Sequence, residues 1–157
     1  MTALNQPGSI KRTVALSEIQ VILNTYCTLA RGNSDWDQIA KLFTADAKFR
    51  FGPGGAISVH PSQISGVAGE GEAAYIRHHL TSWRATFVSD NEAHVDSQFF
   101  AITDQTPLGV LDHWGRWEDI FVREGDAWLI KNRLVIGEGA HPDGWLAERS
   151  KSFAEGK

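Results

Sequence analysis

Four strand-like segments, separated by short turn sequences, occupy most of the second half of this chain of 157 residues. Alternating apolar and polar positions and turn residues predict strands at 81–89, 92–103, 110–123 and 127–136. Sequential strands joined by short turns favour an antiparallel meander. Because helical spacing precedes them, the expected class is α+β and not a doubly wound parallel sheet.

Three helices are expected before these strands. The first follows apolar positions at helical spacing over 16–30, and Ser17 with Gln20 is typical of a capping box at its start. The second is expected to begin at Ser34, whose hydroxyl can cap the first turn. The third is expected over about 70–79, immediately before the first strand of the meander.

A short strand at 48–51 and a glycine-rich loop at 52–66 separate the second and third helices, and loops of this length are often functional. The length fits one domain, which we place at 14–137. We expect a flexible arm over 1–13 and a tail over 138–157 that packs on the sheet or on a neighbouring subunit.

The composition excludes several classes of protein. The net charge of −4 and the lack of basic runs argue against nucleic-acid binding. No apolar stretch is long enough to span a membrane and no targeting segment is visible, so we expect a soluble, cytoplasmic protein. The single cysteine, Cys27, excludes an internal disulfide, and no third ligand accompanies His94 and Asp96, so no metal site is expected.

Four short motifs occur in a fixed order along the chain. They are Leu42-Phe43-Thr44-Ala45-Asp46-Ala47, His78-His79-Leu80-Thr81-Ser82, Gly115-Arg116-Trp117-Glu118-Asp119 and Trp128-Leu129-Ile130-Lys131-Asn132-Arg133. Together they resemble the SnoaL-like branch of the nuclear-transport-factor-2-like superfamily. The resemblance implies three N-terminal helices packed in a strongly curved, mainly antiparallel sheet, a cone with a central pocket.

The superfamily includes ketosteroid isomerases, scytalone dehydratase, hexachlorocyclohexane dehydrochlorinase and non-catalytic binders, so function must be argued from the site itself. The surroundings of His78 resemble those of the dehydrochlorinase's catalytic histidine, and imidazole suits proton abstraction near neutral pH. That enzyme orients its histidine with a carboxylate from the first helix, where this chain has Thr28. Tyr26 could act as an acid instead, and His79 replaces His78 if the register differs by one.

A second constellation lies on the third strand of the meander. By alternation, His113, Trp117 and Asp119 share one face, which mixes large aromatic side chains with a histidine and a carboxylate. A buried Asp119 could act as an acid or base because burial raises the pKa of a carboxyl group. A structural ion pair between Asp119 and either Arg133 or Lys131 is the favoured alternative.

Large aromatic side chains and one amide are expected to line the pocket. Asn132 is the expected hydrogen-bond donor because it alternates with Trp128 and Ile130 on the last strand. The expected walls are Trp36, Phe49, Phe51, Phe99 and Trp117.

These residues predict a cofactor-free acid–base enzyme, a lyase, dehydratase or isomerase, including retro-aldol cleavage. Its substrate would be a small, largely apolar or aromatic molecule, with His78 as the base and Tyr26, His113 or Asn132 polarising an oxygen. The alternative is a non-catalytic small-molecule-binding protein or accessory subunit of the same fold. A homodimer or homotrimer through the outer face of the sheet is expected in either case.

Overall fold

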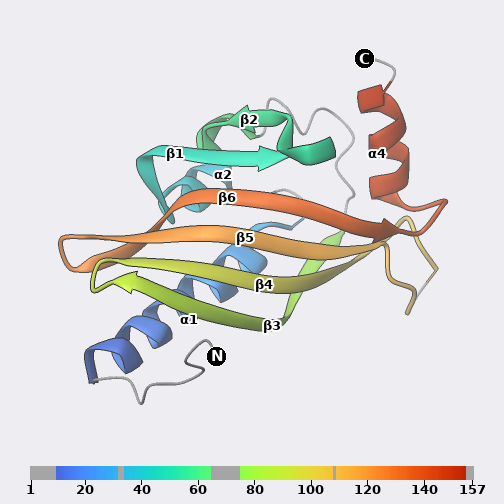
Figure 1. Cartoon of the computed structure of the whole chain (residues 1–157). Helices are drawn as coiled ribbons and strands as arrows, with labels where there is room; N and C mark the ends of the chain where they lie inside the picture. The colour runs from blue at the N-terminus through green and yellow to red at the C-terminus, as the bar shows by residue number, and fades with distance from the viewer. Residues whose placement is uncertain (1–9, 32–33, 65–74, 108, 155–157) are drawn as a thin grey trace.

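The computed structural model describes residues 10–31, 34–64, 75–107 and 109–154, without the side chains of 152–154. Its elements, in chain order, are α1 (Ile10–Leu29), α2 (Trp36–Ala40), β1 (Phe43–Phe51), β2 (Ile57–Val59), β3 (Ile76–Ser89), β4 (Glu92–Thr103), β5 (His113–Glu124), β6 (Ala127–Ala140) and α4 (Trp145–Ala154), as Figure 1 shows. The predicted α+β class is confirmed. None of the described helices is long and apolar enough to cross a membrane.

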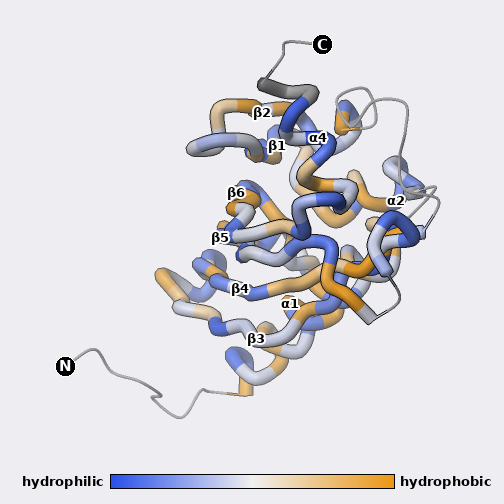
Figure 2. The backbone as a smooth tube through the Cα atoms, turned by 90° about the vertical axis from the view of Figure 1, so that its right-hand side faces the viewer, coloured by the Kyte–Doolittle hydropathy of each residue, from blue (hydrophilic) through white to orange (hydrophobic). Residues whose placement is uncertain are grey.

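One six-stranded sheet carries the fold, in the order β2-β1-β6-β5-β4-β3. Every neighbouring pair is antiparallel except β1 and β6, which are parallel, so the sheet is mixed. Helices α1 and α2 lie on one face of it, as the side view in Figure 2 shows. The expectation of a strongly curved cone is wrong. Strands β3 to β6 pair along most of their lengths, and the sheet that they form is twisted but does not curl strongly (Figure 1).

Helix α1 begins earlier than the sequence pattern indicated. The described part of the chain is already helical at Ile10, so Ser17 lies inside α1 and does not cap it. Ala15, Ile19 and Leu23 form one buried stripe on this helix, whereas Ile10 to Val14, the added part, are exposed. The expected boundary of the N-terminal arm at residue 13 therefore falls within the helix, while residues 1–9 lie outside the described residues.

The segment after α1 also differs in detail. Asp35, and not Ser34, caps α2, since its Oδ1 accepts a hydrogen bond from the Gln38 amide at 3.0 Å. Strand β1 begins at Phe43, five positions before the expected strand at 48–51. The expected loop at 52–66 contains the short strand β2, which pairs with the end of β1.

The third helix, expected over about 70–79, is wrong for those of its residues that the structure describes as a strand. Residues 65–74 lie outside the described residues, and from Ile76 onward the chain is in β3. Here His78 pairs with Ala101 and His79 with Phe100 of β4. Hydrogen bonding to β4 thus keeps the backbone extended at His78 and His79, although the local sequence pattern predicted the end of a helix there.

The remaining strands follow the predicted alternation closely. Strand β4 has the predicted bounds, and on β5 the residues from His113 to Phe121 alternate between buried and more exposed positions. Their buried face packs against α1 in one hydrophobic core. At the C-terminus, β6 continues to Ala140 and the expected tail contains α4, which lies at one end of the sheet (Figure 1).

Candidate functional site

His78 is held at the start of β3 by the end of α1. Its Nδ1 lies 2.9 Å from the carbonyl oxygen of Ala30. Because a carbonyl only accepts hydrogen bonds, Nδ1 carries the proton, and Nε2 of the neutral ring presents a lone pair. Burial, followed by the neighbouring His113, lowers the pKa of His78 to about 4. His78 is therefore a neutral base near pH 7.

The Ala30 carbonyl performs part of the role that a carboxylate near Thr28 would perform. Thr28 itself is exposed and donates its hydroxyl to the carbonyl oxygen of Asn24, away from His78. A backbone carbonyl fixes the tautomer of His78 but supplies no negative charge to an imidazolium. Nothing in the residue types could have revealed this contact, since every residue carries a carbonyl.

The second histidine has a carboxylate of its own. His113 Nδ1 lies 2.7 Å from Oδ1 of Asp112, and both side chains are buried. Although burial alone would raise it, hydrogen bonds from His113, the Trp145 amide and Thr103 hold the pKa of Asp112 below its ordinary value. An ionised Asp112 accepts from Nδ1–H, so Nε2 of a neutral His113 is unprotonated. Asp112 is not among the residues predicted from the sequence, although it directly precedes His113.

The two imidazoles lie side by side. The ring centroids of His78 and His113 are 5.5 Å apart, with the ring planes at 71°. His79 does not share this position, because it is exposed and stacks on Phe100 at a centroid distance of 4.9 Å. Of the two neighbouring histidines that the sequence left open, His78 therefore faces the core and His79 the outer side of the sheet.

Aromatic side chains surround the histidine pair. Phe99 and Trp117 are stacked with centroids 4.6 Å apart, and His78 lies 5.7 Å from Phe99 and 6.3 Å from Trp117. Trp145 from α4 contacts the other imidazole, with its ring centroid 5.9 Å from His113. The two imidazoles thus sit among aromatic rings, and for His78 this burial disfavours the charged form.

The aromatic contacts continue from this wall to β1. Tyr26 joins Trp117 at 5.2 Å and Phe43 at 6.4 Å, and Phe43 contacts Phe49, which contacts Phe51. Trp36 is half-buried and packs against the same core. The fold therefore brings the predicted wall residues into one cluster. The rings of Phe49 and Phe51 lie at its β1 end, where their contacts are with other aromatic rings.

Asp119 forms a buried ion pair with Arg133. Arg133 Nε donates to Oδ1 at 2.8 Å and Nη2 donates to Oδ2 at 2.7 Å, and both side chains are fully buried. Burial raises the pKa of Asp119, although the Arg133 charge and its hydrogen bonds act in the opposite direction. The predicted structural pair is thus confirmed, and both Asp119 oxygens are occupied by a guanidinium group.

A bulge in β6 explains why Arg133, and not Asn132, reaches the interior. The register between β5 and β6 shifts between Ile130 and Asn132, so one extra residue lies on β6 there. The predicted alternation of Asn132 with Trp128 is therefore wrong: Asn132 is half-buried, whereas Arg133 has no exposed surface. Sequence alternation could not anticipate this shift.

Tyr26 and Arg133 meet at the centre of the core. The guanidinium carbon of Arg133 lies 4.1 Å from the Tyr26 ring centroid and 4.3 Å from that of Trp117. Burial raises the pKa of Tyr26 above its ordinary value, so its hydroxyl stays protonated at neutral pH. Arg133 Nη1 is buried without a hydrogen-bond acceptor among the described residues. Tyr26 and Arg133 are therefore the available hydrogen-bond donors beside the aromatic wall.

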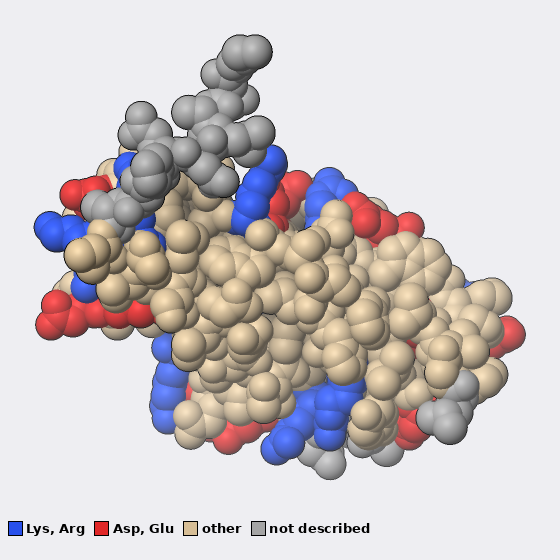
Figure 3. Space-filling model, turned by 90° about the horizontal axis from the view of Figure 1, so that it is seen from below, with Lys and Arg blue, Asp and Glu red and all other residues tan. Residues whose placement is uncertain are grey.

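Two surface cavities lie along α1 between Ile10 and Ile22, away from the end of the helix that contacts His78. The larger, of about 510 Å³, is lined by Ile10, Lys11, Arg12, Val14, Ala15, Phe87, Asp90, Asn91 and Arg123. The other, of about 360 Å³, lies between α1 and the turn that joins β5 to β6. Seen from below in Figure 3, the molecule presents a broad uncharged area with charged side chains around its margin. Within the described ranges, no three His, Cys, Asp or Glu side chains are grouped so that they could hold a metal ion.

Comparison with protein families gives one match. The family described as "SnoaL-like domain" matches residues 12–134, which include α1 and most of the sheet. No curated protein matches the chain.

Three solved structures illustrate the range of similar proteins. A proposed scytalone dehydratase from Novosphingobium aromaticivorans is 20% identical, with a TM-score of 0.70, over 83% of this chain and 89% of that one. A hexachlorocyclohexane dehydrochlorinase from Novosphingobium barchaimii is 12% identical, with a TM-score of 0.72, over 85% and 93%. The β subunit of a proposed aromatic-ring-hydroxylating dioxygenase from N. aromaticivorans is 16% identical, with a TM-score of 0.67, over 83% and 93%. At these identities the likeness establishes the fold alone.

Proposed function

Since the chain belongs to the SnoaL-like domain family, we propose that it is a cofactor-free acid–base enzyme of lyase or isomerase type. It acts on a small, largely apolar or aromatic molecule by elimination, dehydration, isomerisation or retro-aldol cleavage. His78 is the general base. The observation that carries this proposal is the pairing of His78 with the Ala30 carbonyl, which leaves Nε2 as a lone pair beside a second imidazole.

The histidine pair suits removal of a proton from a bound molecule. Both Nδ1 atoms are occupied, by Ala30 and Asp112, so both Nε2 atoms accept when the rings are neutral. The pKa of about 4 makes His78 neutral at pH 7 but a weak base on its own. His113 lies beside it and is hydrogen-bonded to Asp112 through Nδ1, so it carries the second acceptor nitrogen of the pair.

The neighbouring groups define the substrate class and the acid. Phe99 and Trp117 offer aromatic faces, which favour a planar or apolar ligand. Tyr26 stays protonated and donates a hydrogen bond to an oxygen of the substrate, a role that Arg133 Nη1 supports. Asp119 positions Arg133 and does not itself transfer protons, because Arg133 engages both of its oxygens.

A ligand screen followed by turnover assays tests the proposal. Small hydroxylated aromatic and polycyclic compounds are screened for a rise in the melting temperature of the protein, because ligands that bind the native state stabilise it. Compounds that bind are then assayed for elimination, dehydration, isomerisation and retro-aldol products.

The decisive variant in this assay is His78→Gln. It is expected to retain ligand binding and to lower kcat at least about 100-fold, since general acid–base catalysis contributes that much. His79→Gln, a change on the exposed side of the same strand, serves as the matched control and is expected to keep wild-type turnover. Equal turnover by His78→Gln and wild type would show that His78 is not the base.

The second candidate is a non-catalytic ligand-binding protein or accessory subunit. The observation that favours it is the dense aromatic packing around Trp117, together with the location of the two described cavities away from His78. A β subunit of a proposed dioxygenase among the similar structures fits the same idea. In that case compounds bind without any product being formed, and Phe87→Ala at the larger cavity, not His78→Gln, weakens their binding.

A further inference from the structure

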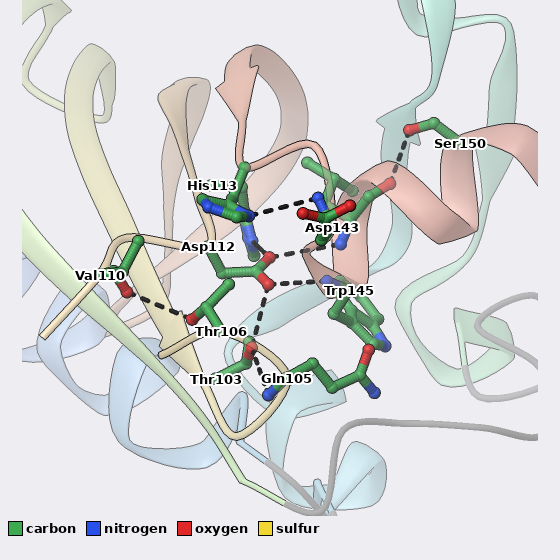
Figure 4. Close-up of polar contacts among 11 residues, drawn as sticks. Thr103, Gln105, Thr106, Val110, Asp112, His113, Asp143, Trp145 and Ser150 are labelled. Carbon is green, nitrogen blue, oxygen red and sulfur yellow. Dashed lines mark hydrogen bonds and ion pairs between the residues drawn. The ribbon is translucent and has the colours of Figure 1, made fainter. Parts of the chain in front are cut away.

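Asp112 lies between two parts of the molecule that are far apart in the sequence. It precedes β5 and has no exposed surface. Its Oδ1 accepts from His113 Nδ1 at 2.7 Å, and its Oδ2 accepts from the Trp145 amide at 2.7 Å. Figure 4 shows the carboxylate at the centre of these contacts, between the imidazole of His113 and the first turn of α4.

Asp112 also serves as the cap of α4. Its Oδ1 accepts a further, longer hydrogen bond from the Leu146 amide at 3.3 Å, so two of the otherwise free amides at the start of α4 are satisfied by one carboxylate. The residue before the helix is Gly144, which has no side chain that could do this. A Cβ on Gly144 would lie 2.7 Å from Asp112 Oδ2, so glycine at this position allows the helix to approach the carboxylate.

We propose that Asp112 is a positioning residue, which acts through His113 and joins the C-terminal helix to the histidine pair. The carboxylate fixes His113 as the Nδ1–H tautomer and so directs its Nε2 lone pair to the substrate, while the same carboxylate anchors α4 and, with it, Trp145 against the His113 ring. The inference rests on the proposed function, because it assigns His113 a role in the same reaction.

The variant Asp112→Asn separates the two tasks of the carboxylate. An amide of the same shape presents one acceptor and one donor, whereas the carboxylate accepts on both oxygens. If the amide oxygen stays with the Trp145 amide and Thr103, its NH₂ group faces His113 Nδ1, which must then lose its proton. If the oxygen turns to His113, it also keeps the longer bond from the Leu146 amide, but the Trp145 amide loses its acceptor. One amide cannot serve both.

The readout is nuclear magnetic resonance of the full chain without ligand. Long-range ¹H–¹⁵N spectra of the histidine side chains report the tautomer, and amide exchange of Trp145 and Leu146 reports the capping of α4. The wild type is expected to show Nδ1–H at His113 and slow exchange. Asp112→Asn is expected to lose the Nδ1–H tautomer, the slow exchange, or both.

Two control variants define what each loss means. Thr103→Val removes the hydroxyl that donates to Oδ2 at 3.0 Å but leaves the three other partners, His113 and the amides of Trp145 and Leu146, so both readouts are expected to match wild type. Gly144→Ala crowds the carboxylate from the α4 side only, so the amides of α4 are expected to exchange faster while His113 keeps its Nδ1 proton.

The proposal is overturned if Asp112→Asn keeps both the Nδ1–H tautomer and the slow exchange. A proton on Nε2 of His113 in the wild type overturns it as well, and that measurement does not depend on whether any variant folds. Both results are independent of a substrate. If His78→Gln leaves turnover intact, the proposed reaction fails while the structural link stands.

Once a substrate is known, the kinetics give a further readout. Asp112→Asn is expected to lower kcat about 10–100-fold with little change in KM, since removal of a hydrogen-bonding partner behind a working group has effects of this order. A change in KM alone, with kcat equal to that of Thr103→Val, would mean that Asp112 only supports the shape of the site.

Discussion

Strand β5 carries two buried polar clusters, and their hydrogen bonds are used in different ways. Towards the middle of β5, Asp119 and Arg133 are joined by two short hydrogen bonds between opposite charges. At its start, Asp112 and the Ala30 carbonyl each hold one nitrogen of an imidazole, and the other nitrogen of each ring stays free to accept.

The difference separates a structural pair from the pair that we propose to be reactive. In the pair of Asp119 and Arg133, the strongest donors and acceptors satisfy each other, and neither charge can be given up without leaving the other buried alone. In the histidine cluster, burial keeps His78 neutral near pH 7, and a second imidazole lies beside it. Each cluster contains an aspartate, Asp112 directly before β5 and Asp119 within it, so the two carboxylates differ in their partners and not in their chemical type.

The largest expected effect comes from breaking the ion pair. Arg133→Met leaves Asp119 buried without its partner and is expected to lower the free energy of unfolding by about 3–5 kcal/mol. The double variant Asp119→Leu with Arg133→Met removes both charges and is expected to recover most of this loss. Urea unfolding measures both; a double variant as unstable as the single one would contradict the view that Asp119 and Arg133 act as a pair.

Gly115 lies between the two clusters on β5 and tests how tightly they are connected. A Cβ at this position would lie 2.1 Å from the carbonyl oxygen of Ile136, a backbone atom that cannot move without shifting β6. Gly115→Ala is therefore expected to cost about 3 kcal/mol of unfolding free energy. In Gly139→Ala, the control, the new methyl group meets the ring of Trp114, which is partly exposed and can turn away. Thermal and urea unfolding should rank the two variants in this order.

The histidine cluster predicts a dependence of stability on pH. The pKa of His78 is about 4 in the folded protein, and about 6.5 for an unperturbed histidine. Between these values the unfolded chain binds more protons, so the free energy of unfolding falls as the pH falls, by about 2 kcal/mol from pH 7.5 to pH 5. His78→Gln is expected to remove this pH-dependent part of the free energy of unfolding. His79→Gln, a change at an exposed position, is expected to retain it. An unchanged pH slope in His78→Gln would place the pKa of His78 near its ordinary value.

The smallest effect is expected on the outer face of the sheet. Arg84 and Asp96 form an ion pair at 2.9 Å, but 73% and 53% of their side chains are exposed. Solvent screens such pairs, so Arg84→Ala is expected to leave the melting temperature unchanged within error. A clear loss of stability would indicate that this face is covered in solution, for example by a second copy of the chain.

The two clusters also differ in how far the sequence could predict them. The alternation on β5 correctly predicted that His113, Trp117 and Asp119 share a buried face. An ion pair of Asp119 with Arg133 or Lys131 was predicted from the next strand, and the structure has Arg133. Such predictions succeed because side chains of a regular strand repeat every two residues. The bulge before Asn132 breaks that period, and therefore the expected pocket amide was placed on the wrong side.

The histidine cluster was only partly predictable for a different reason. His78 could be chosen from its residue type and surroundings, but its partners are a backbone carbonyl and a carboxylate that also caps a helix. These contacts join the end of α1, the start of β5 and the start of α4. No local sequence pattern predicts contacts between segments that are so far apart in the sequence. The helix expected over 70–79 failed likewise, because pairing with β4 decided the backbone at His78.

The parallel pairing of β1 with β6 has a consequence for the order of folding. Strands β3 to β6 follow one another through short turns and can pair as soon as each is synthesised. Strand β1 is synthesised early, but its partner strand β6, which places Arg133 opposite Phe49, is synthesised only after β5. The chain emerging from the ribosome therefore carries the aromatic side of β1 without its neighbour until β6 is complete, and closure of this long loop is the step that we expect to limit the folding rate.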